Sequence, residues 1–170
     1  MSKVKRAGAA VGISVGAAAL AAAAIQHWEG EKLVASHNSF DPAGVVDVCN
    51  GITNRRWPWL KPGMRFTPEQ CKQALIEIIP DYAAPLVNCI NGFGGMPPHR
   101  QAALISASWN LGPATVCKST AVKLLNAGDV LGGCKALGNF TKSNGVWLRG
   151  LWNRRNDTYW GEIAWCLRED

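Results

Sequence analysis

Residues 26–53 read QHWEGEKLVASHNSFDPAGVVDVCNGIT, and this stretch decides the predicted fold. Its first part, WEGEKLV, is expected to begin a helix with Glu29 in the first turn, where an acid complements the helix dipole. Asp-Pro-Ala-Gly at 41–44 signals a turn, and a Val-rich run at 45–48 follows as a short strand. Asn50-Gly51 favours a tight hairpin. The stretch therefore predicts a small antiparallel β element after the start of a helix.

Upstream of this stretch, 19 consecutive residues carry no charge. The run from Ala7 to Ile25 contains ten Ala and three Gly but only five larger aliphatic residues, and it follows the bases Lys3, Lys5 and Arg6. As a helix it would cover about 28 Å, enough for a bilayer core. Its few Leu, Ile and Val residues give a weak insertion free energy, and the upstream bases predict a cytoplasmic N-terminus. We expect a membrane helix that inserts but is not held firmly.

Two interpretations of this leader remain open. It is either a signal peptide cleaved near Ala22–Ala24, or an uncleaved anchor that later leaves the bilayer. The second is favoured because the apolar run is longer than a usual signal-peptide core and no polar break precedes the alanines. The predicted organisation is a membrane leader over residues 1–25 and one compact domain over residues 26–170.

Most of the remaining domain has helical patterns. Thr67-Pro68-Glu69-Gln70 is a capping box that opens a helix, which Pro80 is expected to interrupt. Together with the small sheet near the start of the domain, these helices make an α+β pattern. Further helices are expected at 102–111, 119–128, 129–138 and 149–166.

All six cysteines follow the leader. Their spacings contain no Cys-x-x-Cys and no Cys/His pair of the kind that binds zinc, so no metal or other cofactor is expected. An even number in an exported domain favours disulfides, with a preference for near-neighbour pairs such as Cys49–Cys71. The chain carries a net charge of +6, of which the leader supplies half. The remainder suits an anionic wall but is too small to demonstrate a partner.

The candidate chemistry lies in carboxyl groups. The sequence has no Gly-x-Ser-x-Gly, phosphate loop or His-Glu-x-x-His, which argues against the common serine hydrolases, nucleotide enzymes and zinc proteases. Glu29 stands beside Trp28, and Asp41 and Asp47 lie in the following β element. A desolvated carboxylic acid paired with an ionised carboxylate is the arrangement that glycoside hydrolysis needs. Glu29, Asp41 and Asp47 are therefore the candidate catalytic residues.

Nine short motifs follow one another between about residues 26 and 166. They are HWEG at 27–30, DPAG at 41–44, VCNGIT at 48–53, TPEQC at 67–71, RQAALIS at 100–106, WNLG at 109–112, CKST at 117–120, LNAGD at 125–129 and GLWNRR at 150–155. In this order they resemble the motifs of phage-type lysozymes, glycoside hydrolase family 24. The resemblance implies two lobes joined by the helix that begins at Thr67, with a substrate cleft between them. The leader is similar to the signal-arrest-release segment of endolysins that are held inactive on the inner membrane and freed at lysis.

The resemblance also implies hydrolysis of the β-1,4 bond between N-acetylmuramic acid and N-acetylglucosamine in peptidoglycan. Glu29 matches the family's proton donor. The family's second residue lies nine positions on, which here is Asn38, whereas matching the Asp-x-x-Gly turn gives Asp41 after a three-residue insertion. Asp47 stands where the family has Thr. Because Asn38 cannot act as a base, Asp41 or Asp47 is expected to activate water, and both remain open.

Two other functions stay possible at this point. A lytic transglycosylase would form an anhydro product without a water-activating carboxylate, and the irregular Asp spacing is compatible with it. An inactive wall-binding module that keeps the fold is the third possibility, because a fold alone does not establish activity.

The candidate substrate-binding residues are Asn110, Trp57 and Trp59. Asn110 stands where the family's interlobe helix approaches the sugar cleft. Trp57 and Trp59 flank a proline in a loop that has no core to fill, whereas Trp109 is expected in the core. Arg154-Arg155 matches a family motif near the catalytic acid, and an ion-pair role is expected for it.

The expected partners follow from these assignments. They are peptidoglycan and, through residues 7–25, the inner membrane, with no nucleic acid. The chain is expected on the periplasmic face of that membrane first and then, once released, in the periplasm as a monomer.

Overall fold

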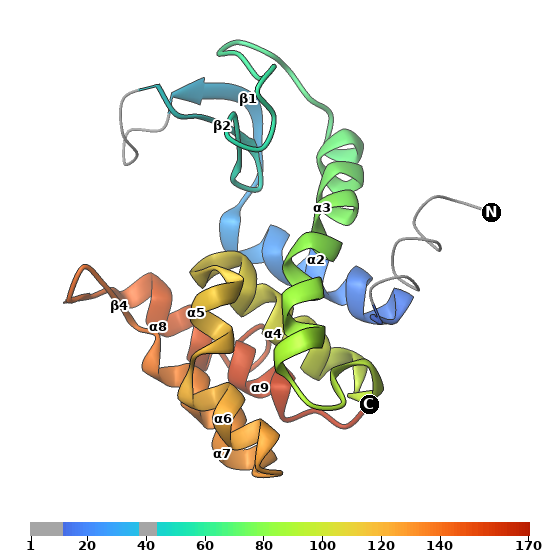
Figure 1. Ribbon diagram of the computed structural model, residues 1–170. Helices are drawn as coiled ribbons and strands as arrows, with labels where there is room; N and C mark the ends of the chain where they lie inside the picture. Colours follow the sequence, from blue (N-terminus) through green and yellow to red (C-terminus); the bar gives the residue numbers. More distant parts are fainter. Residues whose placement is uncertain (1–11, 38–43) are drawn as a thin grey trace.

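The computed structural model describes residues 12–37 and 44–170, which form two lobes joined by the long helix α3 (Pro68–Cys89) (Figure 1). A small sheet makes one lobe and a group of helices makes the other. Each lobe has its own hydrophobic cluster, and α3 contributes residues to both. The predicted α+β architecture, mostly helical with a small antiparallel sheet, is confirmed.

The sheet lobe contains an antiparallel sheet in the order β1-β2-β3. Its strands are β1 (Lys32–His37), β2 (Val46–Cys49) and β3 (Ile52–Thr53). The turn between β2 and β3 includes Gly51 at φ +89°, a conformation that glycine adopts without strain. The predicted hairpin is confirmed, while Asn38 and Asp41 lie outside the described residues.

The expected helix over WEGEKLV is wrong. Helix α2 (Val15–Glu29) ends at Glu29, and Gly30, at φ +70°, turns the chain towards β1. The next residues are held by a distant loop, because Leu33 O accepts from the Phe66 N–H and the Ala35 N–H donates to Met64 O. This long-range pairing outweighs the local helical pattern.

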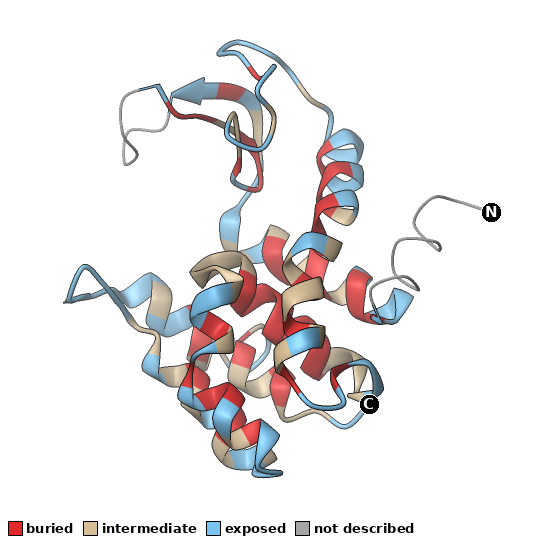
Figure 2. Cartoon of the chain, viewed as in Figure 1, coloured by how far each residue is buried: buried red, intermediate tan, exposed pale blue. Residues whose placement is uncertain are grey.

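Helix α2 packs one face into the core of the helical lobe. Ser14 caps its start by accepting a hydrogen bond from the Ala17 N–H, at 3.0 Å. Ala17, Ala21 and Ile25 are fully buried, and the helix packs mainly on α4 (Pro98–Leu111) (Figure 2). The small side chains of this face allow the two helix backbones to approach closely. The described part of the alanine-rich run is therefore part of the folded core, and α2 crosses the predicted boundary at residue 25.

The membrane helix expected over residues 7–25 falls partly outside the described chain, since residues 1–11 are not described. Within residues 12–37 and 44–170, no helix is both long enough and apolar enough to cross a membrane.

Helix α3 begins with the predicted capping box. Thr67 Oγ1 accepts from the Gln70 N–H at 3.1 Å, and Gln70 Oε1 accepts from the Thr67 N–H at 2.8 Å. The expected interruption at Pro80 is wrong, because the helix continues to Cys89. A proline inside a helix costs about 3 kcal/mol, and the complete burial of Leu75 and Leu86 on either side offsets that loss.

The expected single helix at 149–166 is also wrong. It is divided at Asp157, whose Oδ1 accepts from the N–H groups of Tyr159 and Trp160 and so forms a turn. A hairpin of β4 (Lys142–Ser143) and β5 (Val146–Trp147) precedes the first half.

The remaining helices are α5 (Pro113–Cys117), α6 (Thr120–Asn126), α7 (Val130–Ala136), α8 (Arg149–Asn156) and α9 (Glu162–Cys166), with 3-10 turns η1 (Phe93–Gly95) and η2 (Leu137–Asn139).

Three disulfides join near neighbours in the chain. They are Cys49–Cys71, which matches the prediction, Cys89–Cys117 and Cys134–Cys166. Each closes a loop of 22 to 32 residues, and such a bridge stabilises a fold by about 2–4 kcal/mol. None of the three includes a residue of α2.

The burial pattern of α2 predicts different effects of two otherwise equal changes. Ala21→Leu adds a larger side chain at a fully buried position and is expected to destabilise the fold by about 1–3 kcal/mol. Ala19→Leu adds the same side chain at an exposed position and is expected to change stability by less than about 0.5 kcal/mol. Urea unfolding of protein without membrane checks both values. Equal effects at the two positions would contradict the packing of α2.

Candidate active site

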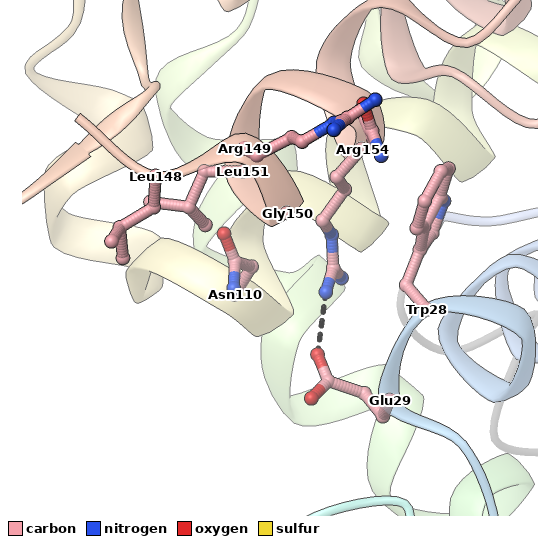
Figure 3. Close-up of a pocket in the computed structure, with 9 residues that line it drawn as sticks. Trp28, Glu29, Asn110, Leu148, Arg149, Gly150, Leu151 and Arg154 are labelled. Atoms are coloured by element: carbon pink, nitrogen blue, oxygen red, sulfur yellow. Dashed lines mark hydrogen bonds and ion pairs between the residues drawn. The ribbon is translucent and has the colours of Figure 1, made fainter.

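A cavity of about 520 Å³ opens between the end of α2 and the start of α8 (Figure 3). It is lined by Trp28, Glu29, Asn110, Leu148, Arg149, Gly150, Leu151, Asn153 and Arg154. Glu29 is the only carboxyl group among these lining residues. The predicted acid and one predicted substrate-binding residue, Asn110, therefore border the same cavity.

Glu29 is held by an arginine from the opposite side of the cavity. Arg154 Nη1 lies 2.5 Å from Glu29 Oε1, and the two side chains point towards one another in Figure 3. The Arg154 side chain is 4% exposed and that of Glu29 is 27% exposed, so the ion pair has a buried end and an open end. This arrangement fixes the direction of the carboxyl group while leaving it accessible to a ligand.

Arg154 is itself fixed by a buried charge network. Its Nε donates to Glu162 Oε1 at 3.1 Å, and its Nη2 donates to Ser106 O at 3.1 Å. Arg155 also pairs with Glu162 and donates through Nη2 to Asn110 Oδ1 at 2.6 Å. Burial lowers the pKa of Arg155, an effect that the carboxylate of Glu162 opposes, and the guanidinium stays charged. The expected ion-pair role of the two arginines is confirmed.

Glu162 is the member of this network that sequence reasoning missed. It is 2% exposed and neutralises two guanidinium groups, while Ser106 Oγ donates to its Oε1 at 2.8 Å. A signal existed in the sequence, because Glu162 is the only glutamate in the segment after the Arg-Arg pair before the last helix ends. A buried pair of arginines requires such a partner.

The sheet lobe holds the chain directly after Glu29. Asn50 Nδ2 donates to Gly30 O at 2.5 Å, and Asn50 is 1% exposed. A Cβ on Gly51 would lie 4.0 Å from Glu29 Oε2, so the hairpin turn approaches the acid closely. The turn between β2 and β3 is thus the part of the sheet lobe that lies next to Glu29.

The helical lobe holds the chain directly before Glu29. Trp28 Nε1 donates to Trp160 O at 3.1 Å, and the His27 ring stacks on the Trp160 ring at 4.6 Å between centroids. The Asp157 turn positions Trp160. Hydrogen bonds from the Trp160 and Tyr159 N–H groups lower the pKa of Asp157. Glu29 therefore sits at the junction of the two lobes, with its neighbours attached to each.

The two candidate bases are not both placed by the structure. Asp47, on β2, forms an ion pair with Lys32 of β1 and does not line the cavity. Asp41 lies outside the described residues. A base for water activation consequently remains a prediction.

A smaller cavity of about 50 Å³ continues from Gly51 between the lobes, and its lining includes Thr53, Arg56, Tyr82 and Trp109. Trp109 packs against both hydrophobic clusters, in keeping with the predicted core role, and its ring contacts that of Tyr82 at 4.7 Å. Burial raises the pKa of Tyr82. Trp57 and Trp59 line neither of these cavities and border a separate groove.

The buried network predicts a large effect of Glu162→Gln. Two guanidinium groups would lose their shared counter-charge, and the expected loss of stability is about 3–5 kcal/mol. Glu169→Gln is the matched control, because Glu169 also pairs with a buried arginine, Arg100, but is itself 77% exposed. That change is expected to cost less than about 1 kcal/mol. Denaturant unfolding measures both variants, and similar small losses would contradict the network's structural role.

The Asp157 turn predicts a pH dependence of stability. Because the folded pKa of Asp157 is lowered, its stabilisation is present above the ordinary value of about 4 and is lost as pH falls through the lower folded pKa. The advantage of the wild type over Asp157→Ala should be complete at pH 6 and should shrink below about pH 4. Unfolding midpoints at several pH values test this. An advantage that does not change with pH would refute it.

Comparisons with known proteins agree with this geometry. A family model described as phage lysozyme matches residues 26–158. The SAR-endolysin of Bacteriophage PS119 is 30% identical over 115 residues, which cover 68% of this chain and 66% of that protein, just under two thirds of its length.

Two solved structures have the same fold. The endolysin from Escherichia coli O157:H7 phage FAHEc1 has a TM-score of 0.72 at 26% identity, covering 89% of this chain and 92% of that one. The active form of the P1 phage endolysin Lyz has a TM-score of 0.68 at 25% identity, covering 92% of this chain and 85% of that one. Since the family model matches well over half of the sequence and includes Glu29, the chain belongs to the phage lysozyme family.

Proposed function

We propose that the chain is an endolysin that hydrolyses the β-1,4 bond between N-acetylmuramic acid and N-acetylglucosamine in peptidoglycan. The observation that carries this proposal is the position of Glu29, a carboxyl group held by Arg154 in the cavity between α2 and α8. Membership of the phage lysozyme family supports a lysozyme-type reaction, and relatives named SAR-endolysins support a role in host lysis.

In the proposed reaction, Glu29 donates a proton to the oxygen of the leaving sugar. Water then attacks the anomeric carbon from the opposite face of the ring, and a carboxylate accepts its proton. Asp47 is engaged by Lys32, so we test Asp41 first as this base and keep Asp47 as the alternative. Neither role depends on a metal or a cofactor.

A lytic transglycosylase is the second candidate. Glu29 is the only carboxyl group among the described residues that line the cavity, and that reaction needs no second carboxylate. In it, the C6 hydroxyl of the muramic acid ring attacks in place of water, and the product carries an anhydro ring. The two reactions therefore differ in their products.

Helix α2 suggests how activity is controlled. Residues 15–25 belong to the predicted membrane leader, and in the folded domain they contain all the buried residues of α2. They cannot occupy the bilayer and the core at once. While the leader is in the membrane, α2 is absent from the core, and Glu29 at its end cannot be attached to both lobes.

This control places the protein first on the periplasmic face of the inner membrane, in an inactive state. The low apolarity of the alanine-rich run makes its insertion weak, which allows it to leave the bilayer. After release, α2 docks and the enzyme acts on the wall from the periplasm. The names of the SAR-endolysin relatives support this order of events.

Glu29→Gln tests the proposed function. The substitution keeps the shape of the side chain but removes the transferable proton, so wall cleavage should fall by about 10²- to 10⁴-fold. Mass spectrometry of the released muropeptides identifies the reaction. Reducing ends support hydrolysis, and anhydro ends support the transglycosylase. If the wild type releases no muropeptides, the remaining function is that of a wall-binding module.

Asp41→Asn and Asp47→Asn, assayed separately, identify the base. A loss of about 100-fold or more is expected for the residue that activates water, and a near-normal rate for the other. Near-normal rates in both variants would contradict assisted water attack and favour the transglycosylase.

A further inference from the structure

A third cavity, on the sheet lobe, is lined by aromatic rings. It has a volume of about 260 Å³ and lies between the loop after β3 and the first turns of α3. The loop contributes Trp57, Trp59 and Phe66, and α3 contributes Gln70, Gln73 and Glu77. We call this cavity the aromatic groove.

The Trp57 ring stacks on the other two rings of the groove, while the Trp59 and Phe66 rings are tilted by 35° to one another. The Trp57 and Trp59 rings are 5.0 Å apart between centroids at an angle of 20°, and the Trp57 and Phe66 rings are 5.9 Å apart at 21°. Trp59 is 52% exposed. Trp57 and Phe66 are partly buried against the core of the sheet lobe, so the expectation that this loop has no core to fill is wrong, and Trp59 supplies the exposed ring of the groove. An aromatic ring beside a few polar groups in a cavity is typical of ligand sites.

The side of the groove formed by α3 contains Ala74 and three polar residues, one of which, Glu77, carries a negative charge. Gln73 Nε2 donates to Glu77 Oε1 at 2.9 Å, which leaves the other Glu77 oxygen and the Gln73 carbonyl to accept hydrogen bonds. A pyranose ring matches both walls, since its C–H face stacks on an aromatic plane and its hydroxyl groups donate to such acceptors. A phosphate or an anionic lipid headgroup is disfavoured, because the carboxylate of Glu77 would repel it.

The groove is separate from the catalytic cavity and borders the same loop as the small cavity between the lobes. Arg56, directly before Trp57, lines the small cavity that continues from Gly51, and it forms an ion pair with Asp81 of α3. Arg56 and Trp57, which are neighbours in the loop, therefore line the small cavity and the groove respectively. A polymer bound between the lobes that extends past Arg56 would reach the aromatic groove next.

We propose that the aromatic groove is a second saccharide-binding site, which holds the glycan strand of the wall beyond the catalytic cleft. The proposal rests on the proposed function for the identity of the polymer. The groove takes no part in bond cleavage. Its role is to keep the enzyme on an insoluble substrate. Loss of the groove should therefore raise the concentration of whole sacculi that gives half-maximal rate, and it should leave the turnover of short fragments unchanged.

Trp59→Ala is the main test, because Trp59 is half exposed and its loss should not unfold the lobe. The expected result is a rise of about 3- to 10-fold in the concentration of sacculi that gives half-maximal rate. The maximal rate and the cleavage of a short soluble muropeptide should stay unchanged. Trp59→Phe should retain most of the wild-type half-saturation, because it keeps an aromatic plane.

Trp152→Ala is the matched control. Trp152 is 47% exposed on α8 and lines none of the three cavities described above. It should behave as the wild type on both substrates. Gln73→Ala provides a second variant that removes a polar group of the groove and should raise half-saturation in the same direction.

Binding is measured independently of cleavage by NMR. Addition of a soluble N-acetylglucosamine tetramer should shift the indole N–H signal of Trp59 in the wild type and in Glu29→Gln. This readout survives if the wild type cleaves nothing, so failure of the proposed function and failure of the groove are distinguishable.

Three results would overturn the proposal. The first is unchanged half-saturation in Trp59→Ala together with no shift of its indole signal in the wild type. The second is loss of binding to anionic phospholipid vesicles as the sole effect of Trp59→Ala, which would assign the groove to the membrane. The third is a concentration-dependent dimer of the wild type that Trp59→Ala does not form, which would assign the groove to a second copy of the chain.

Discussion

The packing of α2 on α4 is the interaction on which the rest of the structure depends. It buries a face of small side chains, including Ala17 and Ala21, and it completes the core of the helical lobe. The same helix ends at Glu29, so the position of the proposed catalytic acid is a consequence of core packing. Because the alanine-rich run is also the predicted membrane leader, one segment of sequence has two competing environments.

The site around Glu29 is assembled from three directions. Arg154 holds the Glu29 carboxyl group. Trp28, the residue before Glu29, donates a hydrogen bond to the carbonyl of Trp160. Asn50 donates a hydrogen bond to the carbonyl of Gly30, the residue after Glu29. The arginine depends in turn on the buried Glu162. A carboxyl group supported in this way has a fixed direction, which proton transfer to a positioned oxygen requires.

Much of the fold was predictable because its signals are local. The capping box at Thr67 and the Asn-Gly turn after β2 each depend on a few adjacent residues, and both were confirmed. Two expectations failed because distant contacts outweighed local ones. The WEGEKLV segment pairs as a strand instead of forming a helix, and packing preserves the helix through Pro80. A third expectation, one helix over 149–166, failed because the chain turns at Asp157. The Asn144-Gly145 turn between β4 and β5 is a local signal of the same kind, with Asn144 at φ +49°, and it was missed.

The site was predictable only in part. Glu29 and Asn110 were named from motifs and lie in one cavity, whereas Glu162 is brought to the arginines by the tertiary fold and has no motif of its own. Trp57 and Trp59 were expected at the substrate, and the structure places them in a separate groove. The second carboxylate depends on Asp41, which the structure does not describe, and on Asp47, which pairs with Lys32.

The most direct test of the account compares one protein sample before and after release from the membrane. Short soluble muropeptides are added to membrane-held protein, so that access to the wall does not limit the rate, and cleavage is measured again after the membrane potential is dissipated. The account predicts that the membrane-held form is at least about 100-fold less active per molecule and that activity appears together with the released protein. Equal specific activity in the two states would contradict it, because Glu29 would then work without the docking of α2.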